Sequence, residues 1–117
     1  MAGSGSVVNE EYVERVLTLV ERVPAGRVTT YGAIAEAVGA GGPRQVGRVM
    51  ALYGGPVPWW RVVRADGSVP SCHDGEAREH HLQEGTPRRS SGRVDMSAAM
   101  WWPAETLPSA ADSVGGL

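Results

Sequence analysis

The sequence predicts a mainly α-helical domain with a small β-wing, of the helix-turn-helix, winged-helix-like class. An amphipathic repeat lies near the N-terminus, two further helix signals flank a glycine-rich turn, and an extended segment then leads into a tight turn. The length of 117 residues is close to the usual size of one domain. We therefore expect residues 9–103 to fold as one domain, between a flexible N-terminus at 1–8 and a disordered tail at 104–117.

The first helix is expected from Asn9 to about Val23. Asn9 is a favourable N-cap, and the acidic residues that follow it suit the positive end of a helix dipole. Pro24-Ala25-Gly26 ends the helix. Apolar residues recur at i, i+3, i+4 and i+7, so one stripe should be buried: Tyr12, Val13, Val16, Leu17, Val20 and Val23.

Two short helices are predicted next. Thr30 is the expected N-cap of a helix from Tyr31 to Val38, which Gly39 closes. After the turn Ala40-Gly41-Gly42, Pro43 opens a third helix that runs to about Tyr53.

The third helix has two different faces. The inward face should carry Val46, Val49, Met50 and Tyr53. The opposite face combines arginines with small residues, namely Arg44, Gly47, Arg48 and Ala51. Low bulk would let the helix axis approach a nucleic-acid groove, although Gly47 is equally explained by close packing against another helix.

The second half of the domain is expected to hold the wing. Val57 to Val63 reads as an extended segment, and Ala65-Asp66-Gly67 as a tight turn into a second strand, Ser68 to Pro70. After a loop at 71–74, a helix should run from about Gly75 to Glu84, which Gly85 ends. Two further short segments complete the domain, an extended piece at 93–96 and Trp101-Trp102, which should dock on the body.

Charge is distributed unevenly. The net charge is −2 and the pI about 5.9, but six arginines and one glutamate lie between Arg22 and Arg64, a local charge of +5. Local charge sets the attraction to a phosphate backbone, although a solvated arginine-rich face is an equal alternative. No run of about 18 apolar residues is present, residues 1–10 lack the basic and apolar parts expected of a signal peptide, and the single Cys72 excludes an internal disulfide. We expect a cytoplasmic protein without a membrane partner.

Three motifs occur in a characteristic order: Val28-Thr29-Thr30-Tyr31-Gly32, then Arg44-Gln45-Val46-Gly47, then 56–63, Pro-Val-Pro-Trp-Trp-Arg-Val-Val. From about Val13 to Glu84 the chain resembles the DNA-binding domain of the 6-O-alkylguanine-DNA alkyltransferases. Those enzymes carry Pro-Cys-His-Arg where this chain has Pro58-Trp59-Trp60-Arg61. The chain is therefore identified as a member of the alkyltransferase-like proteins. An indole lacks the nucleophilicity of a thiolate, so no catalytic residue is expected.

The resemblance implies a mode of DNA binding. In the family, a helix enters the minor groove and the target nucleotide is flipped out. Arg44 matches the arginine that replaces the flipped base in the stack, and Tyr31 matches the tyrosine that helps to turn its phosphate. Without the resemblance, Tyr31 would be taken as a core residue. The implied DNA contacts are Thr30, Tyr31, Arg44, Gln45, Gly47, Arg48 and Ala51.

The resemblance also implies a lesion pocket lined by Tyr31, Trp59, Trp60, Val62, Ser71 and Cys72. Trp59 could pack on a flipped base, or be an ordinary core tryptophan. Trp60 stands where the enzymes have a proton-relaying His. Glu84 matches the Glu that supports that His, and without it should accept hydrogen bonds from Arg61 in an internal ion pair.

These features predict a protein that binds 6-O-alkylguanine in duplex DNA, flips the base, transfers no alkyl group and marks the lesion for nucleotide excision repair. The implied partners are lesion DNA and a repair protein, with the chain a DNA-associated monomer and no cofactor. Two alternatives remain: an alkyltransferase that uses Cys72 with His73 or His80 as base, and a binder of undamaged DNA such as a transcription regulator. The spacing of Cys72, His73, His80 and His81 matches no zinc pattern, so no metal is assigned.

Overall fold

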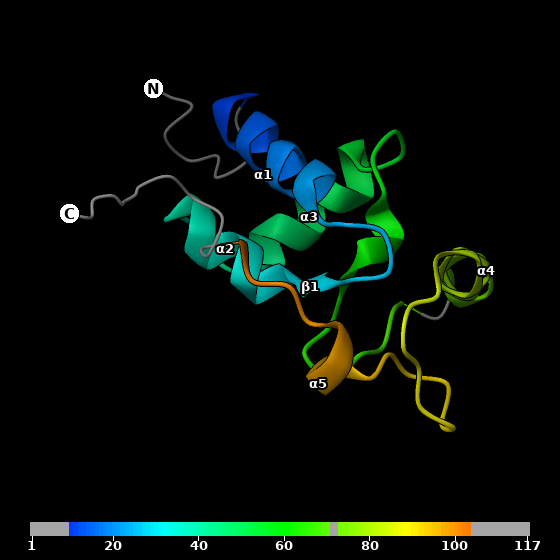
Figure 1. The fold of residues 1–117 in the computed structure, drawn as a ribbon. Coiled ribbons are helices and arrows are strands. Elements are labelled where there is room, and N and C mark those ends of the chain that lie inside the picture. The colour runs from blue at the N-terminus through cyan, green and yellow to red at the C-terminus, as the bar shows by residue number, and fades with distance from the viewer. Residues whose placement is uncertain (1–9, 71–72, 104–117) are drawn as a thin grey trace.

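The computed structural model describes residues 10–70 and 73–103. Three helices form one packed group, α1 (Glu10–Arg22), α2 (Tyr31–Val38) and α3 (Pro43–Tyr53), with α4 (Asp74–Glu84) set apart from them (Figure 1). The predictions for the ends of the chain, for Asn9 and for Ser71 and Cys72 lie outside the described residues. Among the described residues, no helix is long and apolar enough to cross a membrane.

The main core lies between α1, α2 and α3. The predicted stripe of α1 is largely confirmed, because Tyr12, Val16 and Val20 are buried and Val23 is buried just after the helix. Leu19 joins them, which the stripe did not include. Core residues on the other elements are Ile34, Ala35, Val38, Val46, Val49, Val57 and Val62. This core fixes α3 with one face inward and the other outward.

Local signals set the bounds of α2 and α3 as predicted. The Thr30 hydroxyl accepts a hydrogen bond from the N–H of Ala33 at 3.0 Å, and Gly39 ends α2 in the left-handed region with φ of 83°. The Gln45 side chain accepts from the N–H of Gly42 at 2.8 Å at the start of α3. Tyr53 differs from prediction, since it is 48% exposed. It is the last residue of α3, and the chain turns at Gly54, so no element covers its ring.

The β-structure is small and differs in its pairing from the predicted wing. The segment expected to be extended contains a 3₁₀ turn, Trp59–Arg61, followed by β2 (Val62–Val63). β2 pairs in parallel with β1 (Thr29–Thr30), Thr29 opposite Val62. The turn at Gly67 forms, with the N–H of Arg64 donating to the carbonyl of Ser68 at 2.9 Å, but 68–70 is not a strand. Pro70 has no N–H to extend such a ladder.

A second, smaller core holds the C-terminal part of the domain. It consists of Val28, Val63, Val94 and Ala99, all buried. The backbone of Val28 accepts from Trp101 at 2.7 Å and donates to Ala99 at 3.0 Å. The predicted docking at Trp101-Trp102 is thus made by the backbone, while the Trp102 ring is 48% exposed.

The region after α4 also departs from prediction. The expected extended piece at 93–96 is reduced to one bridge, between Arg88 and Val94. Met96 instead begins a four-residue helix that the sequence did not predict, α5 (Met96–Ala99). The N–H of Ala99 donates to the carbonyl of Asp95 at 2.9 Å, which closes this single turn. So short a helix gives no periodic signal in a sequence.

Candidate nucleic-acid interface and base pocket

A cavity of about 410 Å³ opens between α3, the 3₁₀ turn and the start of α4. Three residues predicted for the lesion pocket, Tyr31, Trp59 and Val62, line it together. Its other lining residues are Gly47, Met50, Ala51, Gly54, Gly55, Val69, Pro70, His73 and Glu76. Gly47 and Ala51, which were predicted to contact DNA, thus border the cavity on the outer side of α3. Ser71 and Cys72 lie outside the described residues.

The cavity includes residues that the sequence did not single out. Met50 was assigned to the inward face of α3, but it lies one turn from Gly47 and beside Ala51, and it reaches the cavity wall. The spacing of three residues between Gly47 and Met50 could have predicted that both lie near the same side of the helix. By contrast, no local sequence pattern predicts that the 54–55 loop and the 69–70 segment line the same cavity.

Gly47 leaves open space beside α3. A Cβ atom built at this position would meet no heavy atom of another described segment within 4 Å. Close packing of α3 against another described helix therefore does not require a glycine here, so this explanation of Gly47 does not hold for the described part of the chain. The space beside Gly47 belongs to the cavity and its mouth.

Trp59 forms an aromatic wall of the cavity. Its ring is half-buried and lies 5.6 Å from the His73 ring, at 55°, and 6.0 Å from the His80 ring, at 81°. Trp60 meets it edge-on, with ring centroids 5.6 Å apart. Trp59 thus packs on Trp60 and His80, which do not line the cavity, and shares the cavity wall with His73, which is unlike a tryptophan enclosed in a core.

Trp60 was predicted to line the pocket, but the structure places it outside the cavity wall, behind Trp59. Its Nε1–H donates to Oε2 of Glu84 at 2.9 Å. Its ring stacks on His80, with centroids 3.6 Å apart and planes 7° from parallel. Trp60 is therefore held on both its polar edge and its face, and it supports Trp59 rather than the cavity directly.

Glu84 accepts hydrogen bonds from three residues and forms the internal ion pair with Arg61 that the sequence predicts. Arg61 donates to its carboxylate through Nε at 3.1 Å and Nη2 at 2.6 Å, and also donates to the carbonyl of Val23 at 2.9 Å. The N–H of Gly26 adds a further hydrogen bond to Glu84 at 3.3 Å. Burial by itself raises the pKa of Glu84, but hydrogen bonds from Arg61, Trp60 and Gly26 outweigh it and hold the pKa below its usual value.

His81 anchors the backbone of the same turn. It is 1% exposed, and its Nε2 lies 2.7 Å from the carbonyl oxygen of Trp60. A carbonyl can only accept, so Nε2 carries the proton, and Nδ1 accepts from the Arg88 guanidinium at 2.7 Å. Burial lowers the pKa of His81, in keeping with this neutral tautomer. Arg88 and His81 thereby tie the segment after α4 to the 3₁₀ turn.

The predicted DNA contacts fall into three groups: exposed arginines, residues that cap helices, and residues that line the cavity. Arg44 and Arg48 are exposed on α3, and neither forms an ion pair with another described residue. Thr30 and Gln45 already serve as caps for α2 and α3. Burial raises the pKa of Tyr31, and the charge of Arg64 opposes that shift in part, so the phenol is neutral at physiological pH.

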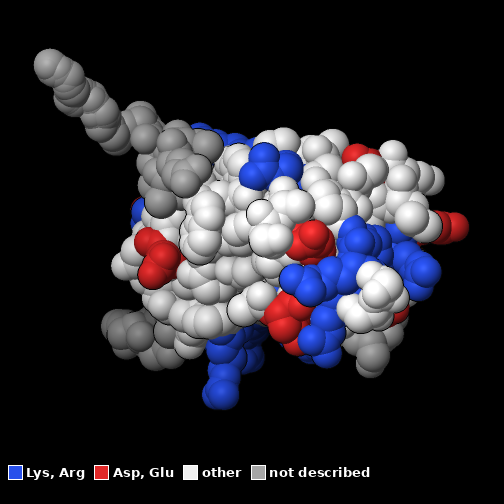
Figure 2. Space-filling model, turned by 60° about the horizontal axis from the view of Figure 1, so that its bottom comes forward, with Lys and Arg blue, Asp and Glu red and all other residues white. Residues whose placement is uncertain are grey.

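The positive charge available to a phosphate backbone is smaller than the sequence count suggests. Of the six arginines between 22 and 64, Arg61 pairs with Glu84, and Arg27 donates to the backbone carbonyls of Ala99 and Met100. Arg27 is nevertheless exposed and keeps its charge, as do the other four: Arg22, Arg44, Arg48 and Arg64. On the face shown in Figure 2, a group of arginines lies on the right with acidic side chains among them, so the field on that part of the surface is mixed.

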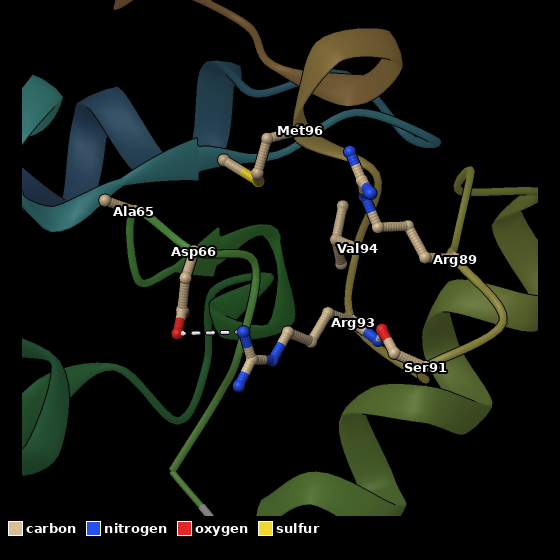
Figure 3. A pocket seen from close by; sticks show the side chains of 7 residues that line it. All are labelled: Ala65, Asp66, Arg89, Ser91, Arg93, Val94 and Met96. Carbon is tan, nitrogen blue, oxygen red and sulfur yellow. Dashed lines mark hydrogen bonds and ion pairs between the residues drawn. The ribbon is translucent and has the colours of Figure 1, made fainter.

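A second cavity, of about 320 Å³, is lined by charged residues from other segments. Arg93 reaches toward Asp66 across it, at 3.5 Å, whereas Arg89 points away from that pair (Figure 3). Both partners of this ion pair are more than half exposed, so solvent screens it and it adds little stability. None of the residues predicted for DNA or lesion binding lines this cavity.

No group of three or more His, Cys, Asp or Glu side chains among the described residues is arranged to hold a metal ion. Among the described residues, the functional groups that line the cavity beside α3 are the Trp59 indole, a neutral phenol, one thioether, one imidazole and one carboxylate.

Comparison with known proteins matches this architecture. Residues 11–85 match the family described as 6-O-methylguanine DNA methyltransferase, DNA binding domain. A DNA base-flipping protein of Escherichia coli is 33% identical over 97 residues, which cover 79% of this chain and 75% of that protein. A DNA base-flipping protein of Vibrio parahaemolyticus is 26% identical over 99 residues, covering 80% and 99%.

The solved structures extend the match to three dimensions. The crystal structure of S. pombe Atl1 in complex with damaged DNA containing O6-carboxymethylguanine superposes with a TM-score of 0.70 at 28% identity, covering 80% of this chain and 97% of that one. A second crystal structure, of S. pombe ATL in complex with DNA, gives a TM-score of 0.69. The chain therefore belongs to the alkyltransferase-like family, which is built on the DNA-binding domain of the 6-O-methylguanine DNA methyltransferases.

Proposed function

We propose that this protein binds 6-O-alkylguanine in duplex DNA, rotates the base into the cavity behind α3 and leaves the alkyl group in place. The observation that carries the proposal is the cavity itself, with Trp59 as its aromatic wall and the small residues Gly47 and Ala51 at its edge. Its volume suits a single planar ligand. The E. coli relative is named a DNA base-flipping protein, and S. pombe Atl1 is seen with damaged DNA, which supports the same role here.

In this proposal the outer face of α3 contacts the minor groove. Arg44 and Arg48 supply positive charge, and the Arg44 guanidinium stacks in the space that the flipped base leaves. The flipped base packs against Trp59, since stacking on an aromatic ring tolerates an added alkyl group. Tyr31, protonated and at the cavity wall, donates a hydrogen bond to the base or its phosphate.

The absence of alkyl transfer is proposed from the chemistry of Trp59. An indole offers a weak N–H donor and no thiolate, and the resemblance places it where the enzymes carry their nucleophile. The bound, flipped lesion then marks the site for nucleotide excision repair, with a repair protein as partner. The protein acts as a monomer associated with DNA, without a cofactor.

The experiment that tests this function compares two duplexes that differ only in one base. Binding should be tighter when 6-O-methylguanine replaces guanine, and intact mass after incubation should show no methyl gain. Equal affinities would favour a binder of undamaged DNA, and a mass gain on Cys72 would favour an alkyltransferase.

Arg44→Ala should weaken lesion binding by about 1–3 kcal/mol, because the stack is left unfilled. Titrations by fluorescence anisotropy measure the change. Arg22→Ala is the matched control, since Arg22 is also exposed but lies in the last turn of α1 and does not line the cavity. It should lower the affinity for both duplexes alike. Equal effects of the two substitutions would remove Arg44 from the site.

Tryptophan emission should change more with lesion DNA than with normal DNA, because Trp59 lines the cavity. Trp59→Phe should remove most of this difference, whereas Trp101→Phe should keep it. Trp101 is held near Val28 through its backbone, on the second core. Loss of the difference in the Trp101 variant would show that the base binds elsewhere.

A further inference from the structure

The charge of the base cavity is unusual for a site that faces DNA. Among its described lining residues, Glu76 is the one carboxylic acid, and no arginine contributes. Tyr31 is a neutral phenol there, because burial raises its pKa. His73, the remaining titratable group of the wall, sits beside Trp59. The cavity is therefore aromatic with a carboxylate at its edge.

Glu76 has no evident structural task that would explain its place. It is exposed in the first turn of α4, and its side chain makes no hydrogen bond or ion pair with another described residue. As an acidic residue near a helix N-terminus it adds a modest dipole interaction, but Asp74 supplies the same interaction from outside the cavity. Near a phosphate backbone its charge is unfavourable. Its position on the cavity wall points instead to the base.

An aromatic face and a carboxylate together stabilise a cation. The face of an indole attracts positive charge, and a nearby carboxylate adds a Coulombic attraction. Purines alkylated on a ring nitrogen, such as 7-methylguanine, carry a delocalised positive charge on a flat ring. They also present N–H donors on the edge that pairs with cytosine, whereas 6-O-alkylguanine has lost the proton on N1.

We infer that the cavity discriminates bases by charge, and that Trp59 and Glu76 together favour a flipped purine that is positively charged through ring N-alkylation over a neutral purine of the same shape. The inference rests on the proposed flipping of a base into this cavity. It extends the class of ligand from O-alkylated to N-alkylated purines, and it assigns Glu76 as a specificity-determining residue.

The test uses two duplexes that differ in the charge of one base. One contains 7-methylguanine, protected from depurination by a 2′-fluorinated sugar, and the other contains the neutral isostere 7-methyl-7-deazaguanine on the same sugar. The wild-type protein should bind the charged base about 3- to 10-fold more tightly, from a cation–π contact and a partly exposed charge pair. Glu76→Gln should remove most of this ratio.

Asp74→Asn is the matched control, because Asp74 carries the same charge in the same turn of α4 but does not line the cavity. It should shift both affinities and leave the ratio unchanged. A wild-type ratio of one overturns the inference, and a ratio that survives in Glu76→Gln overturns the role of Glu76. A 6-O-methylguanine duplex in the same series separates the two proposals. If the protein prefers 6-O-methylguanine to guanine but binds the charged and neutral bases equally, only this inference is wrong. If it does not prefer 6-O-methylguanine to guanine, the proposed function is wrong.

Discussion

Glu84→Ala should lower the free energy of unfolding by about 2–4 kcal/mol, the largest stability effect expected from a single polar side chain here. The substitution leaves the Arg61 guanidinium, the Trp60 indole N–H and the Gly26 N–H without their acceptor. Water can reach this half-buried group, which keeps the loss below that of a fully enclosed charge. Urea denaturation measures it as a lower midpoint with an unchanged slope.

Two further variants on α4 test whether the loss of stability is specific to the hydrogen bonds of Glu84. Glu79→Ala removes an exposed carboxylate from α4 and should change stability by less than about 0.5 kcal/mol. Glu84→Gln keeps an acceptor but loses the charge, so an intermediate loss is expected. If Glu84→Ala were no more destabilising than Glu79→Ala, the hydrogen bonds to Glu84 would position Trp60 locally without stabilising the fold.

The same groups set the response to acid. The pKa of Glu84 is lowered in the folded protein, so its contribution is present above the unfolded value of about 4.5 and is lost as the pH falls through the folded pKa. The pKa of His81 is also lowered, by burial, so the unfolded chain takes up a proton first and stability begins to fall below pH 6.5. Glu84→Gln should flatten the lower part of this decline and leave the upper part.

Local chemistry made the helices predictable. The cap at Thr30, the left-handed Gly39 and the proline at 43 act within one turn, and they define α2 and α3 in both sequence and structure. The pairing of β1 with β2 was not predictable, because Thr29 and Val62 are distant in sequence and neither segment alternates. The four residues of α5 likewise depend on docking against Val28.

The site also combines features that the sequence predicted with features that depend on tertiary packing. The resemblance to alkyltransferases pointed to Tyr31 and Trp59, and the structure brings both to one cavity. The stack of Trp60 on His80 and the approach of Glu76 to the cavity depend on how α4 lies against the 3₁₀ turn, which no local pattern encodes. The ion pair of Arg61 with Glu84 was predictable because both residues match family positions. The hydrogen bond that the Trp60 indole donates to Glu84 was not predicted.

Trp59→Cys alone should give little or no alkyl transfer from 6-O-methylguanine. A free thiol is mostly protonated at neutral pH, and Trp60 cannot take its proton. Trp59→Cys with Trp60→His should gain slow transfer, because Glu84 already accepts a hydrogen bond from residue 60 at 2.9 Å and would orient the new imidazole. The readout is a protein mass increase of one methyl group, mapped to residue 59 by peptide analysis.

Loss of two large rings is the main obstacle to this gain. Trp59 and Trp60 pack on each other and on His80, so the double variant should lose several kcal/mol of stability, about 3–5 kcal/mol for each tryptophan in the worst case. Denaturation and transfer are therefore measured on the same preparation, and Trp59→Ala with Trp60→His is the control that lacks the thiol. Transfer by the single variant as fast as by the double variant would mean that the cavity activates a thiol without a relay. A folded double variant that binds the lesion but transfers nothing would mean that a nucleophile and a base are not sufficient for transfer in this cavity, and that the cavity holds the alkyl group out of line for attack.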